Sequence, residues 1–297
     1  MKKWYAVLQL IRPANIVTAI ADIIAGIAIS GFLVPEIIDQ NIIFHIILLS
    51  IATSGLYGGG IVFNDIFDLK QDQLNRPERV IPSGRLSLNQ AKILGIILFT
   101  IGISSAFLVS IHSGYIAISI MVFALLYDKY AKHHTLFGPL NMGLCRGLNL
   151  ILGMSINPYL EPQYYLIGLL PVLFISAITL TAQKETKGKN KVAIAVAMIL
   201  DATIVVGFFI IGQHFNFSFT KAFWFLLFWY GLNTIAKTNA ILNNNPKLIM
   251  KAVKIGVLSL IPLNASYVAG FSNIYMALLV LCLLPFSLFL SKKFPVT

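Results

Sequence analysis

Residues 64–85 read NDIFDLKQDQLNRPERVIPSGR and follow directly on a long apolar run. Within this stretch, Asn64, Asp68 and Asp72 stand four residues apart. Three arginines come next, before another apolar run begins: Arg76, Arg79 and Arg85. The stretch therefore predicts that oxygen ligands and cations gather at the end of one apolar segment.

The spacing of these oxygen ligands indicates a metal site. Four residues of helix turn by about 400°, so the three side chains drift by only about 40° per step along one face. Asp65 points roughly 100° away and is expected to lie apart from them. Hard oxygen ligands without nearby His or Cys suit Mg²⁺, which bridges protein carboxylates to substrate phosphates. One arginine can bind two phosphate oxygens at once. We therefore expect the three arginines to neutralise the phosphate charge that the metal leaves.

The composition excludes an ordinary soluble domain, because 58% of the residues are hydrophobic and 11% are charged. Apolar segments, each close to the roughly 20 residues that a membrane-spanning helix needs, are joined by short connections. They cover residues 16–34, 42–64, 90–111, 114–130, 137–156, 164–182, 192–212, 220–240, 254–271 and 274–291. We therefore expect one all-α, polytopic membrane domain over residues 1–297, whose first segment is retained and not cleaved as a signal peptide.

Basic residues alternate between the connections. They cluster before the first segment and after the second, fourth, sixth, eighth and tenth, whereas the other connections are poor in them. By the positive-inside rule, both termini and residues 64–85 face the cytoplasm, in the inner (plasma) membrane among its lipids. The net charge of +11 then reflects topology and not nucleic-acid binding. The arginines could serve topology alone, but topology does not require carboxylates at helical spacing.

Two motifs carry a resemblance to a known family. NxxxDxxxD at residues 64–72 and RPxRxIPSGRLS at residues 76–87 resemble the first aspartate-rich motif of the UbiA superfamily of intramembrane prenyltransferases. The second run is most similar to the branch of chlorophyll synthases and archaeal geranylgeranylglyceryl phosphate prenyltransferases. Arg12-Pro13-Ala14-Asn15 resembles the RPxN start of the first UbiA helix. The resemblance implies a UbiA-type bundle of nine to ten transmembrane helices around a central cavity.

The resemblance also implies roles for the matched residues. Asn64, Asp68 and Asp72 would hold Mg²⁺, and the two aspartates and Lys132 would be catalytic. Residues that would bind substrate are Asn15, Arg76, Arg79, Arg85 and Tyr127. On chemistry alone, Lys132 fits a topology-setting lysine equally well.

A second aspartate-rich motif of the form DxxxDxxGD is degenerate in this chain, at residues 181–191. Alignment on Gly188 puts Thr181, Glu185 and Lys189 where three aspartates would be expected. Glu185 is then the remaining metal ligand, and Lys184 is a candidate for binding diphosphate in place of a metal. The residues leave open whether the lysines compensate for the lost acids or whether the second metal position is lost.

Charged residues also occur within the apolar segments. Asp22 shares a helix face with Asn15 and Thr18, and it should point into a cavity or toward a partner. Arg146 lies too deep to reach the membrane surface and needs an internal anion, which could be Asp22, Asp201 or an anionic ligand. Substrate binding and a buried structural pair both remain open for Arg146.

A prenyltransferase is the function implied, using Mg²⁺ to transfer a prenyl group from a prenyl diphosphate to an unidentified lipid or aromatic acceptor in the membrane. The alternative is an isoprenoid-binding or precursor-export-associated protein that does not catalyse transfer. It rests on the degenerate second motif and on a similarity to the UbiA-like EboC proteins in the run LIRPANIVTAIADIIAG. Ion-coupled transport, suggested by the intramembrane charges, lacks the internal repeat that is typical of transporters.

Overall fold

The computed structural model describes residues 3–132, 134–182 and 190–294, and every regular element within these ranges is a helix. The elements are α1 (Lys3–Ile11), α2 (Pro13–Ile29), α3 (Gln40–Phe67), α4 (Leu69–Asn75), α5 (Leu88–Val109), α6 (Ile111–Leu126), η1 (Tyr127–Ala131), α7 (Phe137–Met154), η2 (Pro162–Gly168), α8 (Leu169–Ala182), α9 (Lys191–His214), α10 (Phe219–Asn243), α11 (Pro246–Leu258), α12 (Leu260–Phe271), α13 (Ile274–Leu281) and α14 (Leu283–Lys293). The expected all-α class is confirmed.

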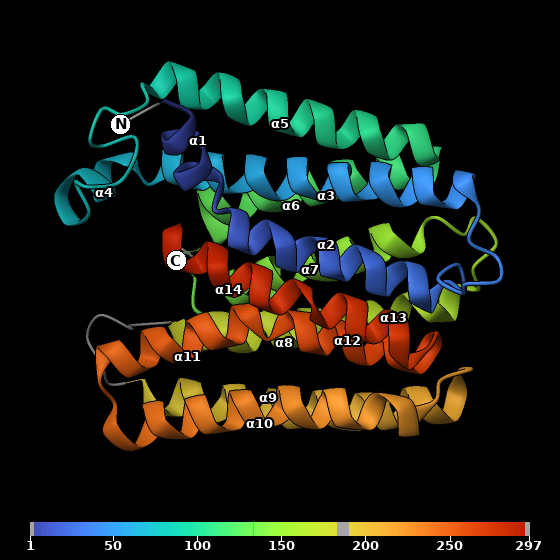
Figure 1. Ribbon diagram of the computed structural model, residues 1–297. Helices are drawn as coiled ribbons and strands as arrows, with labels where there is room; N and C mark the ends of the chain where they lie inside the picture. The colour runs from blue at the N-terminus through green and yellow to red at the C-terminus, as the bar shows by residue number, and fades with distance from the viewer. Residues whose placement is uncertain (1–2, 133, 183–189, 295–297) are drawn as a thin grey trace.

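The long helices run side by side in one bundle (Figure 1). On one side α3 packs against α5, in the middle α2 packs against α7 and α12, and on the other side α9 packs against α8 and α10. The start of α1 and the end of α14 lie at the same end of the bundle as α4 (Figure 1), where the rings of Tyr5 and Phe294 are 5.5 Å apart. This end also carries the 64–85 stretch.

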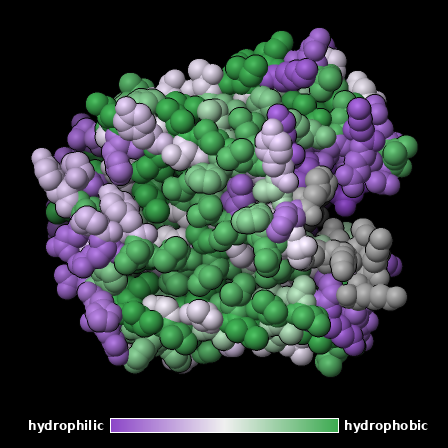
Figure 2. Space-filling model, turned by 180° about the vertical axis from the view of Figure 1, so that it is seen from behind, coloured by the Kyte–Doolittle hydropathy of each residue, from purple (hydrophilic) through white to green (hydrophobic). Residues whose placement is uncertain are grey.

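The surface has the pattern of a membrane protein. A broad apolar band lies between two hydrophilic ends (Figure 2). Seven described helical segments are long and apolar enough to cross a membrane, and the bent pair α1 and α2 raises the number to eight. Two further helices of the bundle, α7 and α10, carry buried polar side chains such as Arg146 and Lys237. Length and composition alone therefore support seven to eight of the ten expected spans.

The first span is broken at Arg12. α1 and α2 meet there at a bend of 49°, and Pro13 is the first residue of α2. A proline disfavours the helical conformation of the residue before it, and Arg12 accordingly adopts left-handed angles, with φ 51° and ψ 70°. Such a conformation costs a non-glycine residue about 1–3 kcal/mol. The bend places the guanidinium of Arg12 beside the 64–85 stretch, where it contacts Asp65.

Glycine permits the closest approach between α3 and α5. A Cβ atom on Gly55 would lie 2.5 Å from the Leu98 carbonyl oxygen and 2.8 Å from the amide nitrogen of Gly102. Both atoms belong to the backbone of α5, which cannot move aside without disturbing the whole helix. α3 therefore depends on a small residue at this position.

We expect Gly55→Ala to lower the midpoint of thermal unfolding in detergent, because overpacking of this kind costs about 1–3 kcal/mol. The matched control is Gly231→Ala in α10, where nothing lies within 4 Å of an added Cβ. Alanine is about 0.5–1 kcal/mol better than glycine within a helix, so this variant should unfold at the native midpoint or above it. Equal midpoints for the two variants would contradict the packing argument.

Candidate active site

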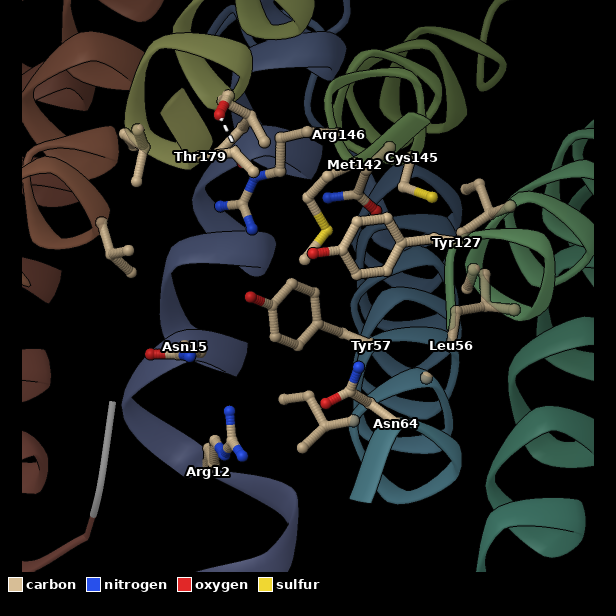
Figure 3. Close-up of a pocket in the computed structure, with 18 of the residues that line it drawn as sticks. Arg12, Asn15, Leu56, Tyr57, Asn64, Tyr127, Met142, Cys145, Arg146 and Thr179 are labelled. Atoms are coloured by element: carbon tan, nitrogen blue, oxygen red, sulfur yellow. Dashed lines mark hydrogen bonds between the residues drawn. The ribbon is translucent and has the colours of Figure 1, made fainter. Parts of the chain in front are cut away.

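A cavity of about 330 Å³ lies inside the bundle, within the usual size range of small-molecule sites. Its walls come from α2, α3, α6, α7, α8, α11 and α12. Tyr57 and Tyr127 point their rings into the space between Arg146 and Asn15 (Figure 3). Aliphatic side chains complete the lining: Leu56, Ile61, Ile120, Ile175, Ile178, Val253, Val257 and Leu260. The cavity therefore combines an apolar wall with a few polar groups from separate helices.

The first aspartate-rich motif lies where α3 ends. Asn64 lines the cavity and donates from Nδ2 to Asp128 Oδ1 at 2.7 Å. Asp68 follows the last residue of α3 and forms an ion pair with Lys132. Lys132 directly follows η1, a π-helical turn that continues α6. Such turns are frequent at functional sites. Asn64 and Asp68, at the end of α3, thus meet the end of α6.

Asp72 belongs to a separate group of ion pairs. Arg79 Nη1 lies 2.7 Å from Asp72 Oδ2 and 3.5 Å from Asp65 Oδ1. Arg12 Nη2 lies 2.9 Å from the same oxygen of Asp65. Arg79 therefore joins Asp65 to Asp72, although the helical-face argument set Asp65 apart from the ligand face. The physical reason is that α3 ends at Phe67 and α4 starts at Leu69, so the chain does not continue as one straight helix.

The three motif arginines have different positions. Arg79 contacts the carboxylates of Asp65 and Asp72. Arg85 Nη2 donates to the Glu78 carbonyl oxygen at 2.6 Å, and Nη1 contacts the side chain of Gln9 in α1. Arg76 is half-buried and, like Arg85, does not line the cavity. The structure thus brings Arg79 to the carboxylates and places Arg85 against α1.

Arg146 finds its anion inside the protein. It forms an ion pair with Asp22, and its Nη2 donates to Thr18 Oγ1 at 2.9 Å. Asn149 and Asn264 donate to the two oxygens of the same carboxylate, at 3.0 and 2.6 Å. Asp22 is 1% exposed, so one cation and two amide donors stabilise a charge buried among α2, α7 and α12. Of the anions considered from the sequence, Asp22 is the one that Arg146 contacts.

Asp201 has a different partner. Its Oδ2 lies 2.5 Å from Lys237 Nζ, and both side chains are 1% exposed. This pair joins α9 to α10, away from the residues that line the cavity. Asp22 and Asp201 are thus each paired with a basic side chain. Such pairing explains acids within a membrane span without an ion pathway.

The degenerate second motif lies partly outside the described residues, which exclude Lys184, Glu185 and Lys189. Thr181 is described, is fully buried and donates to the Ala177 carbonyl oxygen at 2.8 Å. It therefore hydrogen-bonds within its own helix. The position where the family motif has its first aspartate supplies no carboxylate in this chain.

Sequence reasoning missed three residues that lie beside the motif or line the cavity: Arg12, Tyr57 and Asp128. Arg12 stands in the RPxN run, so that run carried a signal for it. Asp128 follows Tyr127, a predicted substrate-binding residue. Helix geometry alone does not predict that Asp128 faces Asn64 across the bundle. Tyr57 looked like any aromatic residue of an apolar helix.

The donor set fits Mg²⁺. Among the residues that the structure describes, no three His, Cys, Asp or Glu side chains lie close enough together to hold a metal. Mg²⁺, however, commonly binds one or two protein carboxylates and completes its shell with phosphates and water. Asp128 Oδ2 is buried and has no hydrogen-bond partner, while the other oxygen of this carboxylate accepts from Asn64 of the motif. An unmatched buried anionic oxygen is costly, and a cation bound there would remove that cost.

An intramembrane helical bundle with an aspartate-rich motif beside an inner cavity defines a prenyltransferase-type membrane protein. The chain belongs to the UbiA prenyltransferase family, whose model matches residues 22–196. It is 29% identical over 179 residues to a digeranylgeranylglyceryl phosphate synthase of Sulfurisphaera tokodaii, covering 60% of this chain. The chain spans 61% of the length of that relative.

Solved structures share the fold. One described as digeranylgeranylglyceryl phosphate synthase in membranes is 23% identical, with a TM-score of 0.69 over 93% of this chain and 100% of the other. A UbiA homologue from Archaeoglobus fulgidus bound to GPP and Mg²⁺ is 13% identical, with a TM-score of 0.64 over 86% of this chain and 99% of the other. At these identities the likeness concerns the fold.

Proposed function

We propose that this protein transfers a prenyl group from a prenyl diphosphate to an acceptor within the membrane, in a reaction that depends on Mg²⁺. The observation that carries the proposal is the meeting of Asn64, Asp68 and Lys132 at the end of a largely apolar cavity. A prenyl diphosphate has a charged end and an apolar chain, and this arrangement matches both. The names of the relatives, and the GPP and Mg²⁺ bound to one structural neighbour, support it.

Each motif residue receives a role in this proposal. The residues that would hold Mg²⁺ are Asn64, Asp68, Asp72 and Glu185. The cations that would hold the diphosphate are Arg76, Arg79, Arg85, Lys132 and Lys184. Asn15, Tyr127 and Arg146 line the cavity and would contact the rest of the substrate. Bound Mg²⁺ would supply positive charge that stabilises the departing diphosphate.

The reaction breaks one bond and forms another. The allylic C–O bond breaks and its electron pair leaves with the diphosphate. A nucleophilic atom of the acceptor then bonds to the prenyl carbon, and its proton passes to the departing diphosphate. Lys132 and Arg79, which neutralise Asp68 and Asp72 in this structure, would turn toward the diphosphate as its charge grows. The apolar wall would exclude the water that otherwise captures the prenyl carbon.

The relatives' names favour a lipid acceptor over an aromatic one, because the product in those names is a glyceryl phosphate lipid. The proposed location is the inner (plasma) membrane, with both termini and the motif facing the cytoplasm. Two observations support this orientation: the alternation of basic connections along the sequence, and the common end that α1, α4 and the end of α14 share (Figure 1).

A transfer assay tests the proposal. We expect the purified chain to release diphosphate from radiolabelled geranylgeranyl or farnesyl diphosphate when Mg²⁺ and a mixture of lipid and aromatic acceptors are present. Removal of divalent metal with EDTA should reduce release to the background, and excess Mg²⁺ should restore it. Release that persists in EDTA would contradict the metal dependence, and no release with any acceptor would contradict transfer.

A second candidate function is isoprenoid binding without transfer, as the similarity to EboC proteins predicts. It is favoured by the loss of the carboxylate at Thr181 and by the pairing of Asp68 and Asp72 with cations of the chain itself. Under this proposal the chain would retain labelled prenyl diphosphate in an Mg²⁺-dependent manner and release no diphosphate. The same assay therefore separates the two functions.

A further inference from the structure

Asp128 is a buried acid that lines the cavity and to which the proposed function assigns no role. It belongs to η1, the π-helical turn at the end of α6, and is 3% exposed. It lines the same cavity as Asn64, Tyr127 and Arg146. A carboxylate buried to this extent is costly unless a proton, a cation or several hydrogen-bond donors stabilise it.

One of the two carboxylate oxygens of Asp128 has a hydrogen-bond partner. Asn64 Nδ2 donates to Oδ1 at 2.7 Å, whereas Oδ2 is buried without a hydrogen-bond partner. An amide from α3 and a carboxylate from η1 are thus in contact beside the cavity. Each carries an oxygen of the kind that Mg²⁺ prefers.

The charges near Asp128 fit a cation bound between the end of α3 and η1. Lys132 lies one helical turn further on and forms its ion pair with Asp68, on the opposite helix. No ion pair joins Lys132 to Asp128 among the described residues. The ammonium thus pairs with Asp68, whereas Asp128 forms no ion pair with a basic side chain of the described residues.

The second motif supplies fewer acidic metal ligands than the family motif does. Thr181, at the end of α8, stands where the motif would have an aspartate and hydrogen-bonds within its own helix. Of the three aligned positions, one carries an acid, Glu185. A metal that bridges protein and diphosphate therefore has fewer carboxylates on that side than on the side of α3.

We propose that Asp128 is a metal-binding residue that completes the Mg²⁺ site together with Asn64 and Asp68. This inference rests on the proposed function, since it assigns a further ligand to the same site. Two carboxylates and one amide oxygen, with diphosphate oxygens and water, match the usual shell of Mg²⁺. Without metal, the ammonium of Lys132 supplies the positive charge beside Asp68. When the metal binds Asp68, Lys132 becomes available to the diphosphate.

The test measures metal binding directly, without turnover. Mn²⁺ replaces Mg²⁺ as the probe, and its free fraction is followed by electron paramagnetic resonance with the purified full chain in detergent. We expect Asp128→Asn, which keeps the acceptor for Asn64 and removes the charge, to weaken Mn²⁺ binding at least about tenfold, since even outer partners of a metal contribute about 10- to 100-fold. Asp68→Asn should weaken binding as well.

The matched control is Asp39→Asn. Asp39 caps the opposite end of α3 by accepting from the Ile42 amide at 2.8 Å, and asparagine caps equally well. It removes the same charge far from the cavity and should leave Mn²⁺ affinity unchanged. If Asp128→Asn does not fold, Asp128→Ser, which retains an oxygen acceptor without the charge, is measured in its place.

Native affinity in the Asp128 variant, with affinity lost in Asp68→Asn, would overturn this inference and leave the proposed function intact. Loss of affinity in both, with the Asp39 variant unchanged, would support it. A chain that releases diphosphate but binds Mn²⁺ equally well in all variants would overturn the assignment of both aspartates to the metal. A native chain that binds Mn²⁺ through Asp128 yet releases no diphosphate would contradict transfer alone.

Discussion

Asp68→Asn is expected to reduce diphosphate release by at least about a thousandfold, or about 4 kcal/mol of transition-state stabilisation. Asp68 stands between α3 and α4, and its carboxylate contacts Lys132 from the end of η1. Asparagine keeps the size and an oxygen for this contact but removes the charge. The metal then loses an anionic ligand, and Lys132 becomes a cation without its counter-ion.

The measurement is Mg²⁺-dependent release of diphosphate from radiolabelled prenyl diphosphate over a range of metal concentrations. Glu78→Gln is the matched control, since Glu78 is exposed and lies in the loop that follows α4 at the same end of the bundle. It should release diphosphate at the native rate. If Asp68→Asn also does so at saturating Mg²⁺, Asp68 does not act in the reaction.

Arg146→Met is expected to destabilise the protein by about 3–5 kcal/mol, the usual cost of removing one partner from a buried ion pair. Asp22 would remain as a carboxylate that is 1% exposed, with Asn149 and Asn264 as donors but without a cation. The pair joins α2 to α7 across the wall of the cavity. Its loss should therefore lower the stability of the bundle even without substrate.

The double variant Asp22→Asn/Arg146→Met separates the effect of the unpaired charge on stability from the effect of lost packing. It removes both ions and keeps a polar side chain for the neighbouring amides, and replacement of a whole buried pair is often close to neutral. We expect it to recover more than half of the stability that the single variant loses, measured as the free energy of unfolding in mixed micelles. A double variant as unstable as Arg146→Met would mean that packing, and not the unpaired charge, causes the loss.

The sequence was sufficient to predict the all-α membrane fold and the position of the first motif. Runs of about 20 apolar residues form helices in a bilayer whatever their neighbours are, because each helix satisfies its own backbone hydrogen bonds. The aspartate spacing and the RPxRxIPSGRLS run lie within one short stretch. They therefore identified the family, which the match over residues 22–196 confirms.

The sequence could not determine which charges pair. Asn64 and Asp128 are 64 residues apart, as are Asp68 and Lys132, and several other acids and bases stood equally close to an apolar segment. The helical-face argument treated residues 64–72 as one straight helix. α3 ends at Phe67, so that Asp72 joins Arg79 and Asp65 instead of sharing a partner with Asp68.

What the sequence alone determined is local: which segments are apolar enough to span the membrane, and which stretch carries the acids and arginines. The tertiary structure decided the pairs, because a buried charge is stabilised by whichever opposite charge or donor the packing of the helices brings to it. Asp22 could have met any of several cations, and it lies against Arg146 because α2 packs on α7. For the same reason Asp128, unremarkable in the sequence, lies opposite Asn64 beside the cavity.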